Sequence, residues 1–172
     1  DGRRFYTDGP RIHEYLKLMN EKSFGSGDFI TVGEMSSTSI ENCRKYSGEN
    51  EHELSMVFNF HHLKVDYQDK QKWTSMPFDF KELKELFVKW QLGMQENKAW
   101  NALFWNCHDQ PRSLSRFGDD KNYPVESAKM LATAIHMMQG TPYIYQGEEI
   151  GMTNPYFTSI DQYRDVETKN YF

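Results

Sequence analysis

Residues 103–112 read LFWNCHDQPR, an apolar run that passes directly into polar and charged side chains. The leucine, phenylalanine and tryptophan that open it are typical of a buried strand. His108 and Asp109 come where that strand would end. In proteins with parallel sheets, ligands bind beyond the carboxyl ends of the strands. The stretch therefore predicts a strand that delivers polar side chains to one edge of a parallel sheet.

The rest of the chain repeats this arrangement. Apolar runs predict four strands in all, over residues 29–32, 54–60, 102–105 and 141–145. Glu34 follows the first of them, His61 the second and Glu148 the fourth. We therefore expect polar chemistry at the carboxyl ends of all four strands.

Helical patterns fill the segments around these strands. Pro10 suits the first position of a helix of about ten residues, and Ser39 can cap a second, short helix. Asp79, with Glu82 three residues later, predicts the start of the clearest helix in the chain. Pro124 begins the last one.

Helices and strands thus alternate four times, which is the pattern of crossovers that join parallel strands. Both an eight-stranded barrel and an open doubly wound sheet show this alternation. No GxGxxG or GxxxxGK[ST] loop follows a strand, which favours the barrel. A complete barrel of this kind needs about 250 residues. We therefore expect an α/β fold that forms part of a TIM barrel.

The composition limits the classes of partner. The 172 residues are 38% hydrophobic and carry a net charge of −5, which argues against nucleic acid or an anionic membrane as a partner. No apolar run reaches the roughly 18 residues that span a bilayer. Cys43 and Cys107 have neither zinc-site spacing nor the pattern of a disulfide framework. We expect no metal site and a reducing, cytoplasmic compartment.

Glu34 and Asp109 could act as a pair across the mouth of a barrel. Cleavage of a glycosidic bond requires one carboxylic acid to protonate the leaving oxygen and carboxylate charge to support the transition state. His108 could donate a hydrogen bond to a sugar hydroxyl. In the alternative interpretation, the two acids cap loops or pair with surface lysines and the histidine is structural.

His61, His62 and Lys64 form a cluster after the second predicted strand. Positive charge there could contact the phosphate of a sugar-phosphate substrate. A solvated loop is the alternative interpretation.

Four segments resemble one enzyme family: VGEMSSTS (32–39), FNFHHLKVDY (58–67), HDQPRSLSRFG (108–118) and GTPYIYQGEEIGM (140–152). In this order they are similar to the fifth to eighth barrel strands of the α-amylase clan, glycoside hydrolase family thirteen. The resemblance implies a partial (β/α)8 barrel with strands five to eight and their helices. Residues 1–172 would then be the C-terminal half of a catalytic barrel, an incomplete domain.

The same resemblance implies roles for individual residues. Glu34 matches the general acid/base, Asp109 the transition-state stabiliser and His108 a partner in the same sugar subsite, while Arg112 is a further candidate for substrate binding. Cys107 occupies a position where the family usually has asparagine. The family uses no cofactor in this reaction and needs an aspartate nucleophile in a G-x-R-x-D segment, which we expect before residue 1. These 172 residues alone are therefore expected to be inactive.

The first two segments look like the branch of the family that hydrolyses trehalose 6-phosphate to glucose and glucose 6-phosphate. A sugar or sugar phosphate is the expected partner. Two alternatives stay open. One is an oligo-1,6-glucosidase or dextran glucosidase. The other is a non-catalytic half-barrel that self-associates through unpaired strand edges.

Overall fold

The computed structural model describes residues 2–73 and 76–172 and contains a four-stranded parallel sheet. Its strands are β1 (Val32–Met35), β2 (Met56–Asn59), β3 (Asn101–Leu103) and β4 (Thr141–Pro142). They lie in the order β1-β2-β3-β4, and each neighbouring pair is parallel. The prediction of an α/β fold with a parallel sheet is confirmed.

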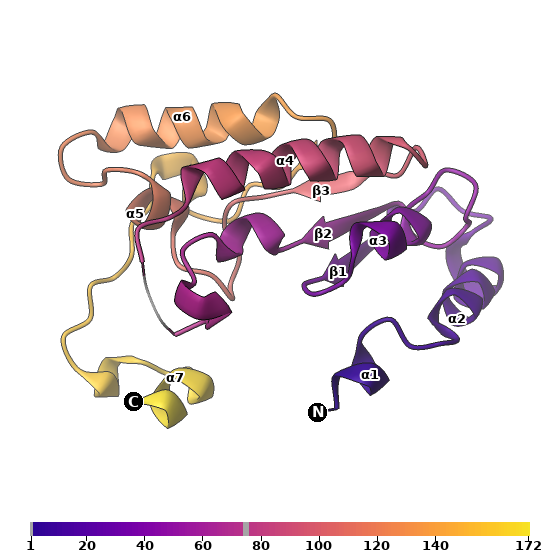
Figure 1. The fold of residues 1–172 in the computed structure, drawn as a ribbon, viewed down its shortest axis with the longest axis horizontal. Helices are drawn as coiled ribbons and strands as arrows, with labels where there is room; N and C mark the ends of the chain where they lie inside the picture. The colour runs from indigo at the N-terminus through magenta and orange to yellow at the C-terminus, as the bar shows by residue number, and fades with distance from the viewer. Residues whose placement is uncertain (1, 74–75) are drawn as a thin grey trace.

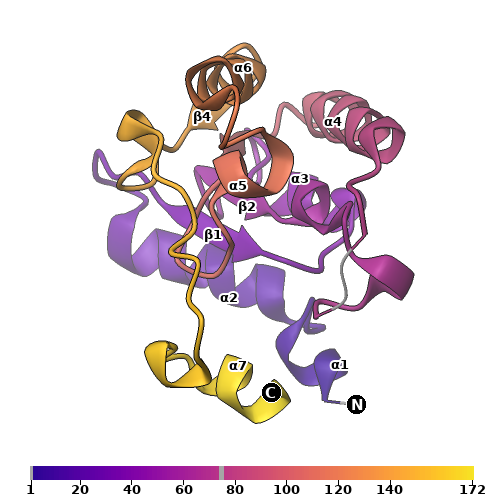
Figure 2. The ribbon, with the colours of Figure 1, turned by 90° about the vertical axis from the view of Figure 1, so that its left-hand side faces the viewer.

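Helices connect the successive strands. They are α3 (Ile40–Tyr46), α4 (Phe80–Gln95), and the pair α5 (Ser113–Phe117) and α6 (Pro124–His136). Three more, α1 (Arg3–Tyr6), α2 (Ile12–Met19) and α7 (Val166–Tyr171), lie before β1 and after β4 in the chain. Figures 1 and 2 show α4 and α6 side by side on one side of the sheet. Sequential strand order with helices on one side is the arrangement of a TIM barrel, whereas a doubly wound sheet has helices on both faces.

Three of the four predicted helix starts are confirmed. The prediction for Pro10 is wrong, because Pro10 lies in the turn before α2, which begins at Ile12 with Arg11 as its N-cap. The Asp79 side chain accepts a hydrogen bond of 2.9 Å from the backbone N–H of Glu82. Ser39 caps α3 by accepting from the N–H of Asn42. Pro124 is the first residue of α6. The two side-chain caps accept hydrogen bonds from N–H groups that a helix start leaves unpaired. Proline has no N–H, so it leaves none unpaired at the first position.

The core lies between the sheet and its helices. Its larger cluster joins strand and loop residues to α4, α5 and α6, and its buried members are Phe60, Leu63, Val65, Leu83, Leu103, Phe104, Trp105, Phe117, Leu131 and Ile135. A second cluster under α3 and α4 comprises Ile40, Cys43, Tyr46, Val57, Trp90, Met94 and Ala99. These clusters hold the strands that carry the candidate site.

The first strand begins three residues later than the sequence suggests. Phe29 and Ile30 were expected in a buried strand, but their side chains are 65% and 76% exposed. The carbonyl of Thr31 accepts hydrogen bonds from Ser55 and Met56, so contact with the second strand starts there. The strands expected over 54–60 and 141–145 are also shorter, at Met56–Asn59 and Thr141–Pro142.

The register sorts side chains onto two faces of the sheet. Glu34 is aligned with Phe58, and Phe58 with Ala102, so these three point to the same side. Val57 and Asn101 are also aligned and point to the other side, toward the helices, where both are buried. The face that carries Glu34 is opposite the helix layer.

Candidate active site

An aromatic floor lies beside Glu34. The Phe58 ring packs edge-to-face against Phe104 at 4.9 Å and against Tyr143 at 4.7 Å between ring centroids. These rings and Glu34 line a pocket of about 330 Å³, whose wall also includes His108. Large apolar ring faces with a few polar groups at the rim are typical of a sugar-binding pocket.

A second, adjoining groove brings the two predicted carboxylates together. Glu34 and Asp109 both line a groove of about 590 Å³, and Lys64 and Tyr67 line it as well. The groove and the pocket share Glu34 and Phe60. The structure therefore places Glu34, His108, Asp109 and Lys64 around this pocket and the adjoining groove, together called the hollow, at the carboxyl edge of the sheet.

His108 and Asp109 form an exposed pair at this edge. His108 Nε2 lies 3.4 Å from Asp109 Oδ2, and the two side chains are 74% and 58% exposed. Both are accessible to a ligand in the hollow. In this position they can donate and accept hydrogen bonds with sugar hydroxyls.

Two hydrogen bonds between Asn106 and Ser113 hold the loop that carries this pair. Oδ1 of buried Asn106 accepts from the N–H of Ser113 at 2.6 Å, and its Nδ2 donates to Ser113 Oγ at 3.0 Å. Between Asn106 and His108, burial raises the pKa of the Cys107 thiol, and the nearby Asp109 and Glu34 carboxylates raise it further. The thiol is therefore protonated at neutral pH and is a weak hydrogen-bond donor here.

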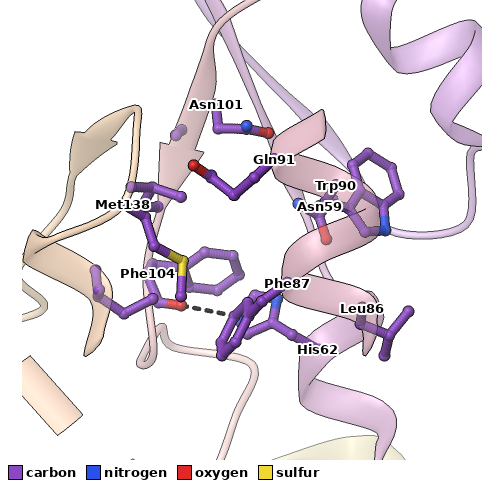
Figure 3. Close-up of a pocket in the computed structure, with 12 residues that line it drawn as sticks. Asn59, His62, Leu86, Phe87, Trp90, Gln91, Asn101, Phe104 and Met138 are labelled. Atoms are coloured by element: carbon purple, nitrogen blue, oxygen red, sulfur yellow. Dashed lines mark hydrogen bonds between the residues drawn. The ribbon is translucent and has the colours of Figure 1, made fainter. Parts of the chain in front are cut away.

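The structure corrects the hypothesis for His62. Its side chain is buried among Phe87, Phe104 and Trp105, and its Nε2 lies 2.8 Å from the carbonyl of Phe104 (Figure 3). Burial lowers its pKa to about 4, so the ring is neutral at pH 7 and Nε2–H donates to that carbonyl. A substrate in the hollow does not reach this ring.

His61 also differs from the expected positive cluster. Its ring packs against Trp90 at 4.9 Å, and burial together with the charges of Lys64 and Lys89 lowers its pKa to about 4. Neither histidine contributes positive charge at neutral pH. Of the three residues of the cluster, Lys64 alone lines the groove.

Lysine side chains make one wall of the groove basic. Lys64 Nζ donates to the carbonyl of Ser36 at 2.6 Å, which holds the ammonium close to the end of β1. Lys70 and Lys72 line the same groove, and Lys72 also pairs with Glu167 at 2.6 Å. The sequence prediction missed Lys70 and Lys72, although both follow the Lys64 loop closely in the chain.

Arg112 holds a neighbouring loop. Its Nη1 donates to the carbonyl of Gln146 at 2.7 Å, its Nη2 contacts Met152 Sδ at 3.0 Å, and its guanidinium lies over the Tyr145 ring. These contacts fix the segment after β4. Arg112 lines neither the pocket nor the groove.

Two further features bear on the kind of site. Among the described residues, no three histidine, cysteine, aspartate or glutamate side chains gather as a possible metal site. Nor does the described part of the chain contain a helix long and apolar enough to cross a membrane.

Comparison with known proteins agrees with this geometry. The family Alpha-amylase, described as "Alpha amylase, catalytic domain", matches residues 1–171. Trehalose-6-phosphate hydrolase of Bacillus subtilis is 63% identical over 172 residues, which are 100% of this chain and 31% of that protein. Oligo-1,6-glucosidase of Bacillus cereus is 53% identical over 171 residues, 99% of this chain and 30% of that protein.

A solved structure is also similar. The crystal structure of trehalose-6-phosphate hydrolase from Bacillus licheniformis superimposes with a TM-score of 0.94 at 61% identity, over 99% of this chain and 31% of that one. The chain thus spans about a third of the length of these relatives. On the match over residues 1–171, with carboxylates at the carboxyl edge of a parallel sheet, this chain belongs to the alpha-amylase family, within its catalytic domain.

Proposed function

We propose that the protein containing this chain is a retaining glycosidase that hydrolyses trehalose 6-phosphate to glucose and glucose 6-phosphate, and that residues 1–172 are the second half of its catalytic barrel. One observation carries the proposal: Glu34, Asp109 and Lys64 line a single groove. Two carboxylates suit glycosidic cleavage, and an ammonium suits a phosphate on the sugar. The identity to trehalose-6-phosphate hydrolase of Bacillus subtilis supports it.

In this mechanism Glu34 protonates the oxygen that bridges the two glucose units. A carboxylate nucleophile attacks the anomeric carbon as the bridging C–O bond breaks, and glucose 6-phosphate leaves. We place that nucleophile, an aspartate, outside these 172 residues. Glu34 then takes a proton from water, which attacks the glycosyl-enzyme and releases glucose.

Asp109 and His108 bind the sugar whose anomeric carbon reacts. A carboxylate accepts hydrogen bonds from ring hydroxyls, and its charge stabilises the oxocarbenium-like transition state. The 330 Å³ aromatic pocket beside them provides apolar surface for the sugar ring.

The basic wall binds the phosphate of the other sugar. Lys64 is its central residue, and Lys70 and Lys72 lie along the same groove. An ammonium is a compact, strongly hydrated charge that suits phosphate oxygens. Phosphate specificity then depends on these lysines and not on His61 or His62.

A substrate panel on the full-length enzyme tests the proposal. Trehalose 6-phosphate, unphosphorylated trehalose and isomaltose are compared by kcat/KM. We expect strong preference for trehalose 6-phosphate, and we expect the glucose to be released as the α-anomer, before mutarotation. Equal or better cleavage of isomaltose would instead support the second candidate, an oligo-1,6-glucosidase, which the 53% identity to the Bacillus cereus enzyme favours. No cleavage of any α-glucoside by the full-length protein would support a purely structural role.

A further inference from the structure

Gln110 lies beside Asp109 and lines the same groove. Its Oε1 accepts a hydrogen bond of 2.8 Å from Nη1 of Arg116. A guanidinium only donates hydrogen bonds, so Oε1 must be the end of the amide that faces Arg116. The two N–H groups of Nε2 therefore lie at the opposite end of the carboxamide.

Arg116 is itself held rigidly. Its Nε and Nη2 donate to Oδ2 and Oδ1 of Asp66, both at 2.6 Å, and the two side chains are 8% and 18% exposed. Nη2 also donates to the carbonyl of Leu63, and the guanidinium lies 4.9 Å from the ring centroid of Phe117. A bidentate pair with this much burial fixes the guanidinium plane.

The contacts of Arg116 join two loops of the site. Leu63 and Asp66 flank Lys64 in the loop after β2, and Gln110 belongs to the loop after β3. One guanidinium therefore bridges the loop that carries Lys64 and the loop that carries Asp109. A shift of that group would alter both sides of the groove.

We propose that Gln110 is a further substrate-binding residue and that Arg116 is its positioning residue. Gln110 donates from Nε2 to an acceptor oxygen of the substrate, either a sugar hydroxyl or a phosphate oxygen. Arg116 fixes the amide so that the donor end faces the ligand. This assignment rests on the proposed function, since it concerns the same groove.

Steady-state kinetics on the full-length enzyme tests this assignment. In Gln110→Met we expect KM for trehalose 6-phosphate to rise about 3- to 10-fold if Nε2 donates to a sugar hydroxyl, and about tenfold or more if it donates to a charged phosphate oxygen, with a smaller change in kcat. In Gln110→Glu, Arg116 keeps its partner but an acceptor replaces the donor, so the rise in KM should be larger. A KM that rises only for the phosphorylated substrate assigns Nε2 to the phosphate. A rise for trehalose as well assigns it to a hydroxyl.

Arg116→Lys tests the positioning role by a double-mutant cycle. If Arg116 acts through Gln110, its substitution raises KM in the native background and adds little to Gln110→Met. Arg44→Lys is the matched control, because Arg44 pairs with Glu96 on the surface away from the groove, and it should leave KM unchanged. Additive effects overturn the positioning role. An unchanged KM in both Gln110 variants overturns the whole assignment, and this result does not depend on whether Arg116→Lys folds. An inactive native enzyme refutes the proposed function itself.

A separate observation indicates a buried water site on the helix-facing side of the sheet. Asn59 and Asn101 are 8% and 4% exposed, and Oδ1 of each accepts no hydrogen bond from the described residues. Asn101 is aligned with Val57, two residues before Asn59, so the two amides are diagonal neighbours on the helix-facing side. Both line a cavity of about 20 Å³ next to Gln91 and Trp90 of α4 (Figure 3).

We infer that one water molecule occupies this cavity and donates a hydrogen bond to each Oδ1. A single water needs about 10–15 Å³ and two to four polar partners, and the cavity offers both. A high-resolution crystal structure of the full-length protein should show spherical density within about 2.7–3.2 Å of both oxygens. The Asn59→Leu, Asn101→Leu double variant should lose that density. An empty cavity in the native protein, or density that persists in the double variant, would overturn the inference.

Discussion

Glu34 in β1 and Asp109 after β3 line one groove of about 590 Å³, although β2 lies between the two strands that carry them. The reason is the parallel arrangement, which brings the carboxyl ends of all the strands to one edge. Residues far apart in the chain can therefore act on one bond. Two hydrogen bonds between Asn106 and Ser113 hold the loop after β3, which carries Asp109.

Glu34→Gln should abolish most of the activity of the full-length enzyme. The amide cannot give a proton to the leaving oxygen, so we expect kcat to fall about 10²- to 10⁴-fold on trehalose 6-phosphate. A substrate whose leaving group needs no protonation, such as an activated aryl glucoside, should lose much less in the first step. Stopped-flow and steady-state kinetics measure both.

Glu85→Gln is the control for this substitution, because Glu85 is a 67% exposed acid on α4 that pairs only loosely with Lys81. It should leave kcat unchanged. A near-native rate in Glu34→Gln would exclude the acid/base role.

Lys64→Ala should weaken binding of the phosphorylated substrate selectively. A hydrogen bond to a charged group contributes about 1.5–3 kcal/mol, so KM for trehalose 6-phosphate should rise tenfold or more. KM for an unphosphorylated analogue should be nearly unaltered. Lys81→Ala, on the exposed side of α4, provides the control. Equal losses on both substrates would show that Lys64 holds the β1 loop, through Ser36, and does not bind phosphate.

The sequence predicts those parts of the fold that depend on local contacts. Asp79 and Pro124 are read correctly as helix starts because capping depends on a few neighbouring residues. The ends of the strands are predicted less accurately. Phe29 and Ile30 have the side chains of a buried strand, but backbone pairing with the second strand decides where β1 begins.

In the candidate site, too, the residues set by local sequence pattern are predicted well and those set by tertiary packing are not. Glu34 and Asp109 follow apolar runs, so their shared edge can be predicted from alternation alone. The Lys64 loop is harder to predict, because its three basic residues at positions 61, 62 and 64 look equivalent in sequence. Tertiary packing decides which of these side chains is buried and which lines the groove. It buries His62 against Phe104 and leaves Lys64 at the groove. Gln110 was missed for the same reason, since its role depends on Arg116.

Asp79→Ala should destabilise the protein without altering the site. Asp79 caps α4, the longest helix of the described chain, and loss of an N-cap side chain costs about 0.5–2 kcal/mol. The free energy of unfolding in urea measures the effect. Asp79→Ser keeps a capping oxygen and should retain most of the stability. A loss in Asp79→Ser equal to that in Asp79→Ala would show that the carboxylate has another role.

His62 should make the stability of the protein depend on pH in a mildly acidic range. Its pKa falls from 6.5 in the unfolded chain to about 4 in the fold because burial disfavours the imidazolium. Between these two values the unfolded chain binds a proton that the folded ring does not. The contribution of His62 to stability is therefore fully present above pH 6.5 and decreases by about 3 kcal/mol as the pH falls toward 4. His61 has the same direction of shift and adds to the slope. Urea denaturation at intervals across this range measures the slope. His62→Phe removes the titrating ring, so its slope should be shallower, whereas His136→Gln, at an exposed ring on α6, should keep the native slope. An unchanged slope in His62→Phe would mean that the ring is protonated in the fold.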